Sequence, residues 1–141
     1  LALGAIIKDS GASEAMANTM ANLLGFDQDG YLSIFSLILI IGVLAIFVIM
    51  LTEFTSNTAS ASLLIPIFAS LSTALNLPPS LLTLVIALGG SCAFMLPVAT
   101  PPNAIVFGTG YIRQIEMIRA GVWLGLFSVV MLIIFGVFIW E

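Results

Sequence analysis

Charged residues are scarce in this sequence. Only 7% of its 141 residues are charged and 61% are hydrophobic, and the mean hydropathy is +1.26. A soluble domain carries roughly 25% charged residues, so the composition indicates an integral membrane protein. The apolar runs are continuous and do not alternate with polar residues, which argues against a membrane β-barrel. We expect roughly four or five membrane-embedded helical segments.

Basic residues are scarcer still, and histidine is absent. Lys8, Arg113 and Arg119 are the only basic residues and the net charge is -4, which argues against nucleic acid as a partner. With no histidine and only Cys92, a transition-metal site is not expected, and no intrachain disulfide is possible. Leu1 is not Met and no positive region of a signal peptide is visible. We therefore expect a piece of a longer protein.

The two ends of the chain have different patterns. In residues 1–30 we predict the end of a preceding helix, an amphipathic interfacial helix over about residues 14–24, and an acidic outer loop. Residues 114–141 are predicted to contain the last transmembrane helix. Arg113 and Arg119 place the connection before that helix on the cytoplasmic side by the positive-inside rule.

Polar, helix-breaking sequence interrupts the apolar segments twice. The first interruption, Leu51 to Ser62, lies within residues 31–75. The second, Pro97 to Ala104, ends a helix predicted over Leu81 to Leu96 and divides residues 81–111. Irregular polar chain at membrane depth persists only where it lines a cavity or is buried in protein. Residues 31–75 fit either two full spans or one re-entrant hairpin, and the first interruption also fits an ordinary cytoplasmic loop.

Each interruption would bring two helix ends together inside the membrane. A helix C-terminus leaves about four unpaired carbonyls and the next N-terminus about four unpaired amides. These ends suit a cation and an anion respectively, and discontinuous helices form the sites of secondary transporters. In the first break, residues 52–55 supply carbonyls and residues 56–58 supply hydroxyl and amide groups. In the second, Ala99 supplies a carbonyl, Thr100 can cap the next helix, and Pro101 suits its first turn.

The ligands available at these breaks are neutral oxygens. Oxygen-only ligation favours Na⁺ over zinc or copper. Since no basic residue lies between Lys8 and Arg113, an anion would be held by hydroxyls, amides, helix N-termini and the cation itself. This dependence gives a physical reason for ion-coupled transport.

Both interruptions resemble the motifs of a known family. Ser56-Asn57-Thr58 resembles the SNT signature of the divalent anion/sodium symporter family, and residues 100–104 resemble its second-repeat unwound loop. The resemblance covers the whole chain and matches the C-terminal half of bacterial INDY-type dicarboxylate transporters. It implies an all-α integral membrane fold, one half of an inverted-repeat transporter, with a re-entrant helical hairpin over residues 31–75 and an unwound helix. It also implies an elevator-type homodimer in the bacterial inner membrane.

The resemblance implies a function and roles for particular residues. The function is sodium-coupled symport of C4 dicarboxylates such as succinate, with Na⁺, the lipid bilayer and the transporter's N-terminal half as partners. Sodium-coupled transport of citrate or sulfate stays open, and a channel is less favoured because no polar stripe follows the spans. The substrate-binding residues would be Asn57, Thr58, Thr100 and Pro101. The Na⁺-binding residues would be Thr52, Ser56, Asn57 and Ala99.

Glu53 is the one charged residue between Gly30 and Ile112. An ionisable residue inside a membrane is costly and marks a functional site by default. We expect it to pair with a group from the N-terminal half or to face a water-filled cavity. No nucleophile–base pair is visible in the sequence, so an enzyme is not expected.

Overall fold

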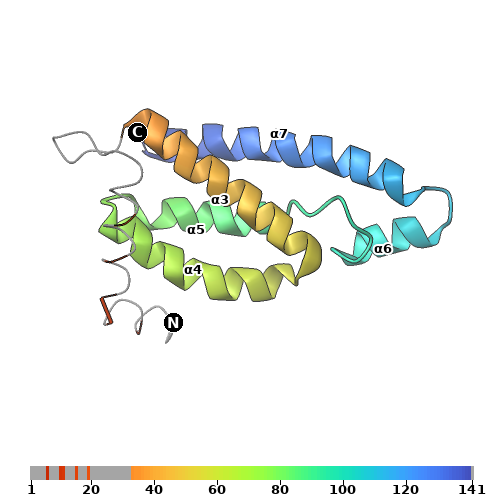
Figure 1. Cartoon of the computed structure of the whole chain (residues 1–141), viewed down its shortest axis with the longest axis horizontal. Coiled ribbons are helices and arrows are strands. Elements are labelled where there is room, and N and C mark those ends of the chain that lie inside the picture. The colour runs from red at the N-terminus through yellow and green to blue at the C-terminus, as the bar shows by residue number, and fades with distance from the viewer. Residues whose placement is uncertain (1–5, 7–9, 12–14, 16–18, 20–32, 141) are drawn as a thin grey trace.

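The computed structural model describes residues 6, 10, 11, 15, 19 and 33–140. The regular structure of these residues is entirely helical (Figure 1), which confirms the all-α expectation. The helices are α3 (Ile34–Phe54), α4 (Asn57–Ala74), α5 (Pro79–Gly90), α6 (Pro101–Gly108) and α7 (Gln114–Trp140). The amphipathic helix predicted over residues 14–24 lies outside the described residues, apart from isolated positions.

Two of the helices are long and apolar enough to cross a membrane. They are Ile34–Phe54 and Gln114–Ile139. A helix of 21 residues such as α3 is about 31 Å long, close to the thickness of the hydrocarbon core. Both helices are apolar around their whole circumference: on α3, Leu37 and Ile41 are buried while Phe35 is 75% exposed. This pattern is typical of a helix surrounded by protein on one side and lipid on the other.

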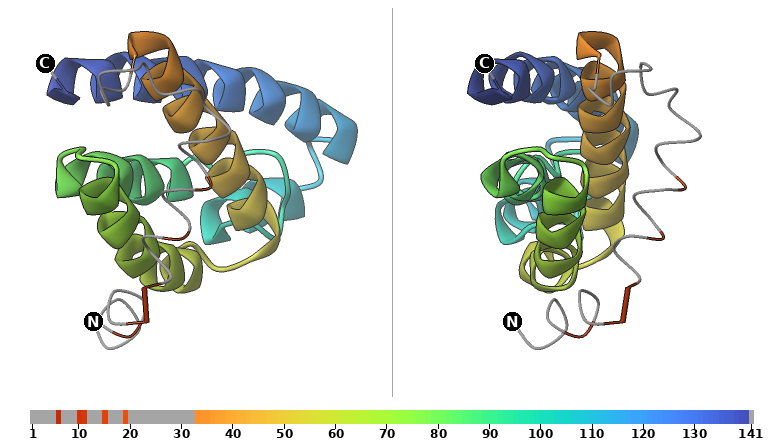
Figure 2. Two further views of the ribbon diagram at one scale, coloured as in Figure 1. Left: turned by 60° about the vertical axis from the view of Figure 1, so that its left-hand side comes forward. Right: turned by 90° about the vertical axis from the view of Figure 1, so that its left-hand side faces the viewer.

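Helix α5 lies at the centre of the bundle. It packs against α4 on one side and against α3 and α7 on the other, and α3 also packs along α7 (Figures 1 and 2). The core consists of aliphatic side chains from these helices, including Ile41 and Val48 of α3, Leu82 and Ile86 of α5, and Leu132 of α7. The short helix α6 contributes no buried residue and lies beyond the ends of α3, α4 and α5 (Figure 1).

Glycines allow α3 and α7 to approach closely. A Cβ atom added at Gly42 would lie 3.3 Å from Ile133 Cδ1, and one added at Gly136 would lie 2.6 Å from Ile41 Cδ1. Membrane helices use small residues in this way, because dispersion contacts between close helices replace the hydrophobic effect that lipid cannot supply. The seam between α3 and α7 is therefore built on glycine–isoleucine contacts.

The two interruptions differ from what the sequence predicts. The first is shorter: α3 runs through Thr52 and Glu53 to Phe54, and α4 begins at Asn57. Two residues, Thr55 and Ser56, separate the two helices, and both the re-entrant hairpin and the ordinary cytoplasmic loop stay open. The second is longer, because α5 ends at Gly90 and not at Leu96 as predicted. Glycine disfavours helix, and the N–H groups of Met95 and Leu96 donate to a distant carboxylate instead of to the helix ladder.

Candidate binding site at two helix breaks

The first break, between α3 and α4, is closed by its own residues. The N–H and the hydroxyl of Thr55 both donate to Leu51 O, at 3.1 Å and 2.8 Å. The Thr55 and Ser60 hydroxyls lie 2.7 Å apart, and Ser56 Oγ accepts from Ala59 N–H at 3.5 Å as the N-cap of α4. The chain reverses with hydrogen bonds that span at most five residues.

Thr52 is fully buried at the end of α3. Its hydroxyl donates to Val48 O and Ile49 O, both at 3.0 Å, which leaves the oxygen lone pairs able to accept or to bind a cation. Because Thr55 N–H pairs with Leu51 O, the carbonyl of Thr52 lies beyond the intrahelical ladder. The residue therefore has the two oxygens that its predicted sodium-binding role requires.

Asn57, the first residue of α4, has an amide oxygen without a partner. Asn57 Oδ1 is buried and has no hydrogen bond in the structure. A buried acceptor without a donor costs about 1–3 kcal/mol, and such groups in native proteins call for an explanation such as a ligand or an ion. The adjacent Thr58 is exposed. Of the groups at the first break, the Asn57 amide oxygen is the one that most needs a ligand.

The second break, residues 91–100, is held by side chains from elsewhere in the sequence. Glu53 is 1% exposed. Its Oε1 accepts from Met95 N–H and its Oε2 accepts from Leu96 N–H, both at 2.8 Å. From the other side, Asn103 Nδ2 donates to Ala93 O and Leu96 O, both at 3.0 Å. These four bonds satisfy peptide groups that the helix ladder has released.

Thr100 and Pro101 occupy the positions that the sequence predicts for them. Thr100 is the N-cap of α6 and its Oγ1 accepts from Asn103 N–H at 3.4 Å. Pro101 and Pro102 form the first turn, where an N–H would have no partner. Ala99 directly precedes this cap and is half-buried. The cap prediction for Thr100 is confirmed, whereas the ligand roles of Thr100, Pro101 and Ala99 stay predictions.

The structure brings the end of α3 against the second break. Thr52 Cγ2 lies 3.9 Å from the position of a Cβ on Gly90, and Glu53 bonds to the break itself. No hydrogen bond within residues 33–140 joins residues 56–58 to Thr100 or Pro101. Glu53 thus joins the end of α3 to the second break, while the roles of the predicted residues of the two breaks in one shared site stay predictions.

Two side-chain contacts with the second break were not predicted from the sequence. Glu53 accepts from backbone amides of this same chain, where the sequence suggested a partner from the N-terminal half or water. The side chain of Asn103 holds the break, although the sequence suggested no role for it. The available signals were a single charge in a long apolar stretch and an amide residue directly after two prolines.

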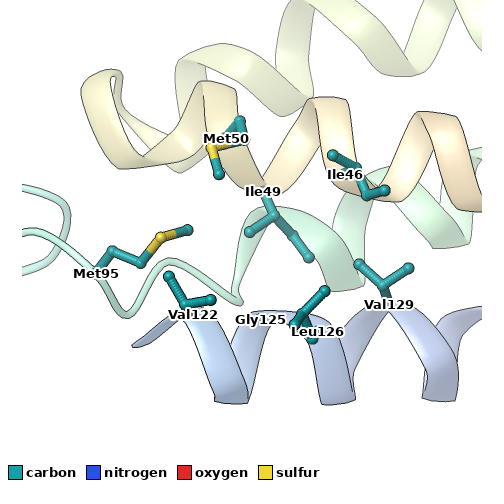
Figure 3. A pocket seen from close by; sticks show the side chains of 8 residues that line it. All are labelled: Ile46, Ile49, Met50, Met95, Val122, Gly125, Leu126 and Val129. Atoms are coloured by element: carbon teal, nitrogen blue, oxygen red, sulfur yellow. The ribbon is translucent and has the colours of Figure 1, made fainter. Parts of the chain in front are cut away.

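An apolar pocket lies beside the second break but offers no polar ligand. Figure 3 shows Met95 facing α3 and α7 across this pocket. Its lining consists of aliphatic and thioether side chains and one glycine: Ile46, Ile49, Met50, Met95, Val122, Gly125, Leu126 and Val129. An ion or a carboxylate would find no polar side chain in the lining of this pocket.

Comparison with known proteins identifies the family of this chain. A family model described as the sodium:sulfate symporter transmembrane region matches residues 1–141. The chain belongs to this family. The resemblance to the divalent anion/sodium symporters is thereby confirmed, and the chain is part of a membrane transporter family and not of an enzyme family.

Two relatives match nearly the whole chain. A protein of Haemophilus influenzae named an uncharacterized transporter is 50% identical over 99% of the chain. The sodium-dependent dicarboxylate transporter SdcS of Staphylococcus saprophyticus is 46% identical over 95% of the chain. The matched regions are 29% and 24% of those proteins, so the chain spans less than a third of their length.

Proposed function

We propose that this chain supplies one half of the binding site of a sodium-coupled symporter for C4 dicarboxylates such as succinate. The observation that carries the proposal is the buried, unpartnered Oδ1 of Asn57, which lies at a helix break in a family of sodium symporters. The name of the SdcS relative, sodium-dependent dicarboxylate transporter, supports the choice of ion and substrate class.

The sodium ion is bound by oxygens at the end of α3 and in the second break. In this proposal the ligands come from Thr52, Ser56, Asn57 and Ala99. Neutral hydroxyl, amide and carbonyl oxygens are hard ligands that suit an alkali cation. The helix C-terminus of α3 adds a partial negative charge at the same place.

The substrate carboxylate is bound at the N-termini of α4 and α6. Asn57 and Thr58 open α4, while Thr100 and Pro101 open α6. The amide of Asn57 can serve both ligands, because its oxygen binds the cation and its NH₂ group donates to a carboxylate. A helix N-terminus attracts an anion through its free N–H groups and its dipole.

Coupling follows from the charges that are present. No Lys or Arg lies between residues 33 and 112, so a bound dicarboxylate has no basic side chain of this region to offset its charge. The sodium ion fills that role, and the substrate binds well only when sodium is bound. In the full transporter, the N-terminal half supplies the other half of the site, and an inner-membrane homodimer moves the loaded site across the bilayer as an elevator.

Reconstitution of the full-length transporter into liposomes tests this proposal. Uptake of labelled succinate is expected with an inward sodium gradient and is expected to be lost when potassium replaces sodium. Sulfate and citrate are measured in the same vesicles, because the family description names sulfate. Succinate uptake that does not depend on sodium contradicts the proposal. If sodium drives the uptake of sulfate but not of succinate, the proposed substrate is wrong and sulfate takes its place.

A further inference from the structure

Glu53 binds the backbone of Met95 and Leu96, which lie 42 and 43 residues further along the chain. The carboxylate is buried in the protein at the last turn of α3. Burial of a charged group is costly unless that group is hydrogen-bonded. Here each carboxylate oxygen receives one backbone N–H at 2.8 Å, which is the length of a strong, charge-assisted bond. The Glu53 carboxylate therefore acts by holding these two backbone N–H groups.

The peptide groups of Leu96 extend this connection to α6. Leu96 N–H donates to Glu53 Oε2, and Leu96 O accepts from Asn103 Nδ2 at 3.0 Å. Asn103 belongs to the first turn of α6, and its own N–H donates to Thr100 Oγ1. A continuous chain of hydrogen bonds thus runs from the end of α3 through the second break to the cap of α6.

The opposite side of the second break is held by packing. A Cβ atom on Gly121 of α7 would lie 2.6 Å from Met95 Cα and 2.7 Å from Met95 N. Only a glycine lets α7 approach the backbone of the break so closely. Met95 is therefore fixed between the Glu53 carboxylate and the bare backbone of Gly121.

We propose that Glu53 is a positioning residue that holds the two breaks in one fixed arrangement. Through Leu96 and Asn103 it sets the place of Thr100 and Ala99 relative to Thr52. The consequence for sodium rests on the proposed function: the ion's ligands on the two breaks are pre-organised, and loss of the carboxylate weakens ion binding without unfolding the helices. A carboxylate is required because it only accepts hydrogen bonds, whereas a glutamine would turn an NH₂ donor toward one of the two N–H groups.

The native Cys92 offers a direct probe of the second break. Its thiol donates to Leu88 O at 3.3 Å and is half-buried, and it lies three residues before Met95. In the full-length transporter with Cys92 as the sole cysteine, we compare the rate of maleimide alkylation in the parent, Glu53→Gln and Glu116→Gln. Glu116 is the matched control, because it lies on α7 and its carboxylate accepts hydrogen bonds from the backbone and side chain of Arg113, the shortest at 2.7 Å.

Glu53→Gln is expected to raise the alkylation rate of Cys92 several-fold, and Glu116→Gln to leave it unchanged. In liposomes, Glu53→Gln should raise the sodium concentration for half-maximal uptake several-fold, with a smaller change in the maximal rate. If Glu53→Gln fails to fold, Glu53→Asp is used, which keeps the charge on a shorter arm and should give an intermediate alkylation rate.

Each outcome has one reading. A parental alkylation rate in a folded Glu53 variant overturns the connection between the breaks. Faster alkylation with unchanged sodium dependence overturns the positioning of the ion site. If the parent protein itself shows no sodium-dependent uptake, the proposed function fails, while the alkylation rates still decide whether Glu53 holds the break.

Discussion

The two helix breaks are stabilised in opposite ways. The break between α3 and α4 is closed locally, by Thr55 bonding back to Leu51 and forward to Ser60. The break between α5 and α6 depends on Glu53 and Asn103, whose side chains reach it from outside residues 91–100. One break is thus specified by its own sequence, and the other by the folded arrangement of α3 and α6.

The two breaks also differ in how their polar groups are used. The first break leaves the amide oxygen of Asn57 without a partner, and in our proposal that oxygen is reserved for a ligand. In the second break, donors and acceptors are used to hold the backbone itself. Removing the contacts that hold the second break should therefore lower stability more than removing those that close the first, whereas removing the Asn57 amide should affect binding and not stability. The predictions below test this contrast, from the largest effect to the smallest.

Gly121→Ala is expected to have the largest effect on stability. The new Cβ would meet the backbone of Phe94 and Met95 at 2.6–2.7 Å, where no flexible side chain can move aside. Overpacking costs typically about 1–3 kcal/mol and occasionally more, and we expect the upper end of that range. Thermal unfolding of the full-length transporter in detergent should show a clearly lower midpoint.

Gly125→Ala is the matched control, one turn further along α7. A Cβ there would lie 3.9 Å from Ile49 Cγ2, an ordinary contact. Since alanine favours helix over glycine by about 1 kcal/mol, this variant should unfold at or above the parental temperature. Equal midpoints for the two variants would contradict the close approach of α7 to the second break.

Asn103→Leu should cause the next largest loss of thermal stability. It removes the donor to Ala93 O and Leu96 O. Leu96 O keeps its bond from Ala99 N–H at 3.2 Å, so Ala93 O is the carbonyl that loses its donor, at a cost of about 1–3 kcal/mol for an unsatisfied buried group. The measurement is again the unfolding midpoint. Thr109→Val is the control: its hydroxyl donates to Val106 O and accepts from Tyr111 N–H, both at the exposed end of α6, and its loss should change the midpoint little. A parental midpoint for Asn103→Leu would show that the break does not need this amide.

Thr55→Val and Ser60→Ala should have small effects. Each removes one side of a hydroxyl–hydroxyl bond within the first break, and Thr55→Val also removes the hydroxyl's bond to Leu51 O. A single hydrogen bond contributes about 0.5–1.5 kcal/mol net. Because both variants break the bond between the two hydroxyls, the loss of stability in the double variant should be smaller than the sum of the losses in the two single variants. A double-mutant cycle of unfolding midpoints measures this coupling, and strict additivity would argue against the bond.

Much of this architecture could be predicted from residue types alone. Apolar length predicts α3 and α7, the serine and threonine caps predict where α4 and α6 begin, and Pro101 predicts the first turn of α6. The end of α5 could not be predicted, because it depends on a distant side chain. The N–H groups of Met95 and Leu96 donate to the Glu53 carboxylate, which lies 42 residues before Met95 in the sequence. The partner of Glu53 was missed for the same reason, since local sequence carries no record of a contact formed only on folding.

The substitution Asn57→Ala tests the central claim most directly, with Thr73→Ala, an exposed site near the other end of α4, as control. We measure sodium-driven succinate uptake and the unfolding midpoint of the full-length transporter for both. Because Asn57 Oδ1 has no partner in the structure, its removal should abolish uptake while leaving the midpoint unchanged or higher, and Thr73→Ala should resemble the parent. Undiminished uptake in a folded Asn57→Ala transporter would contradict a site built on this amide.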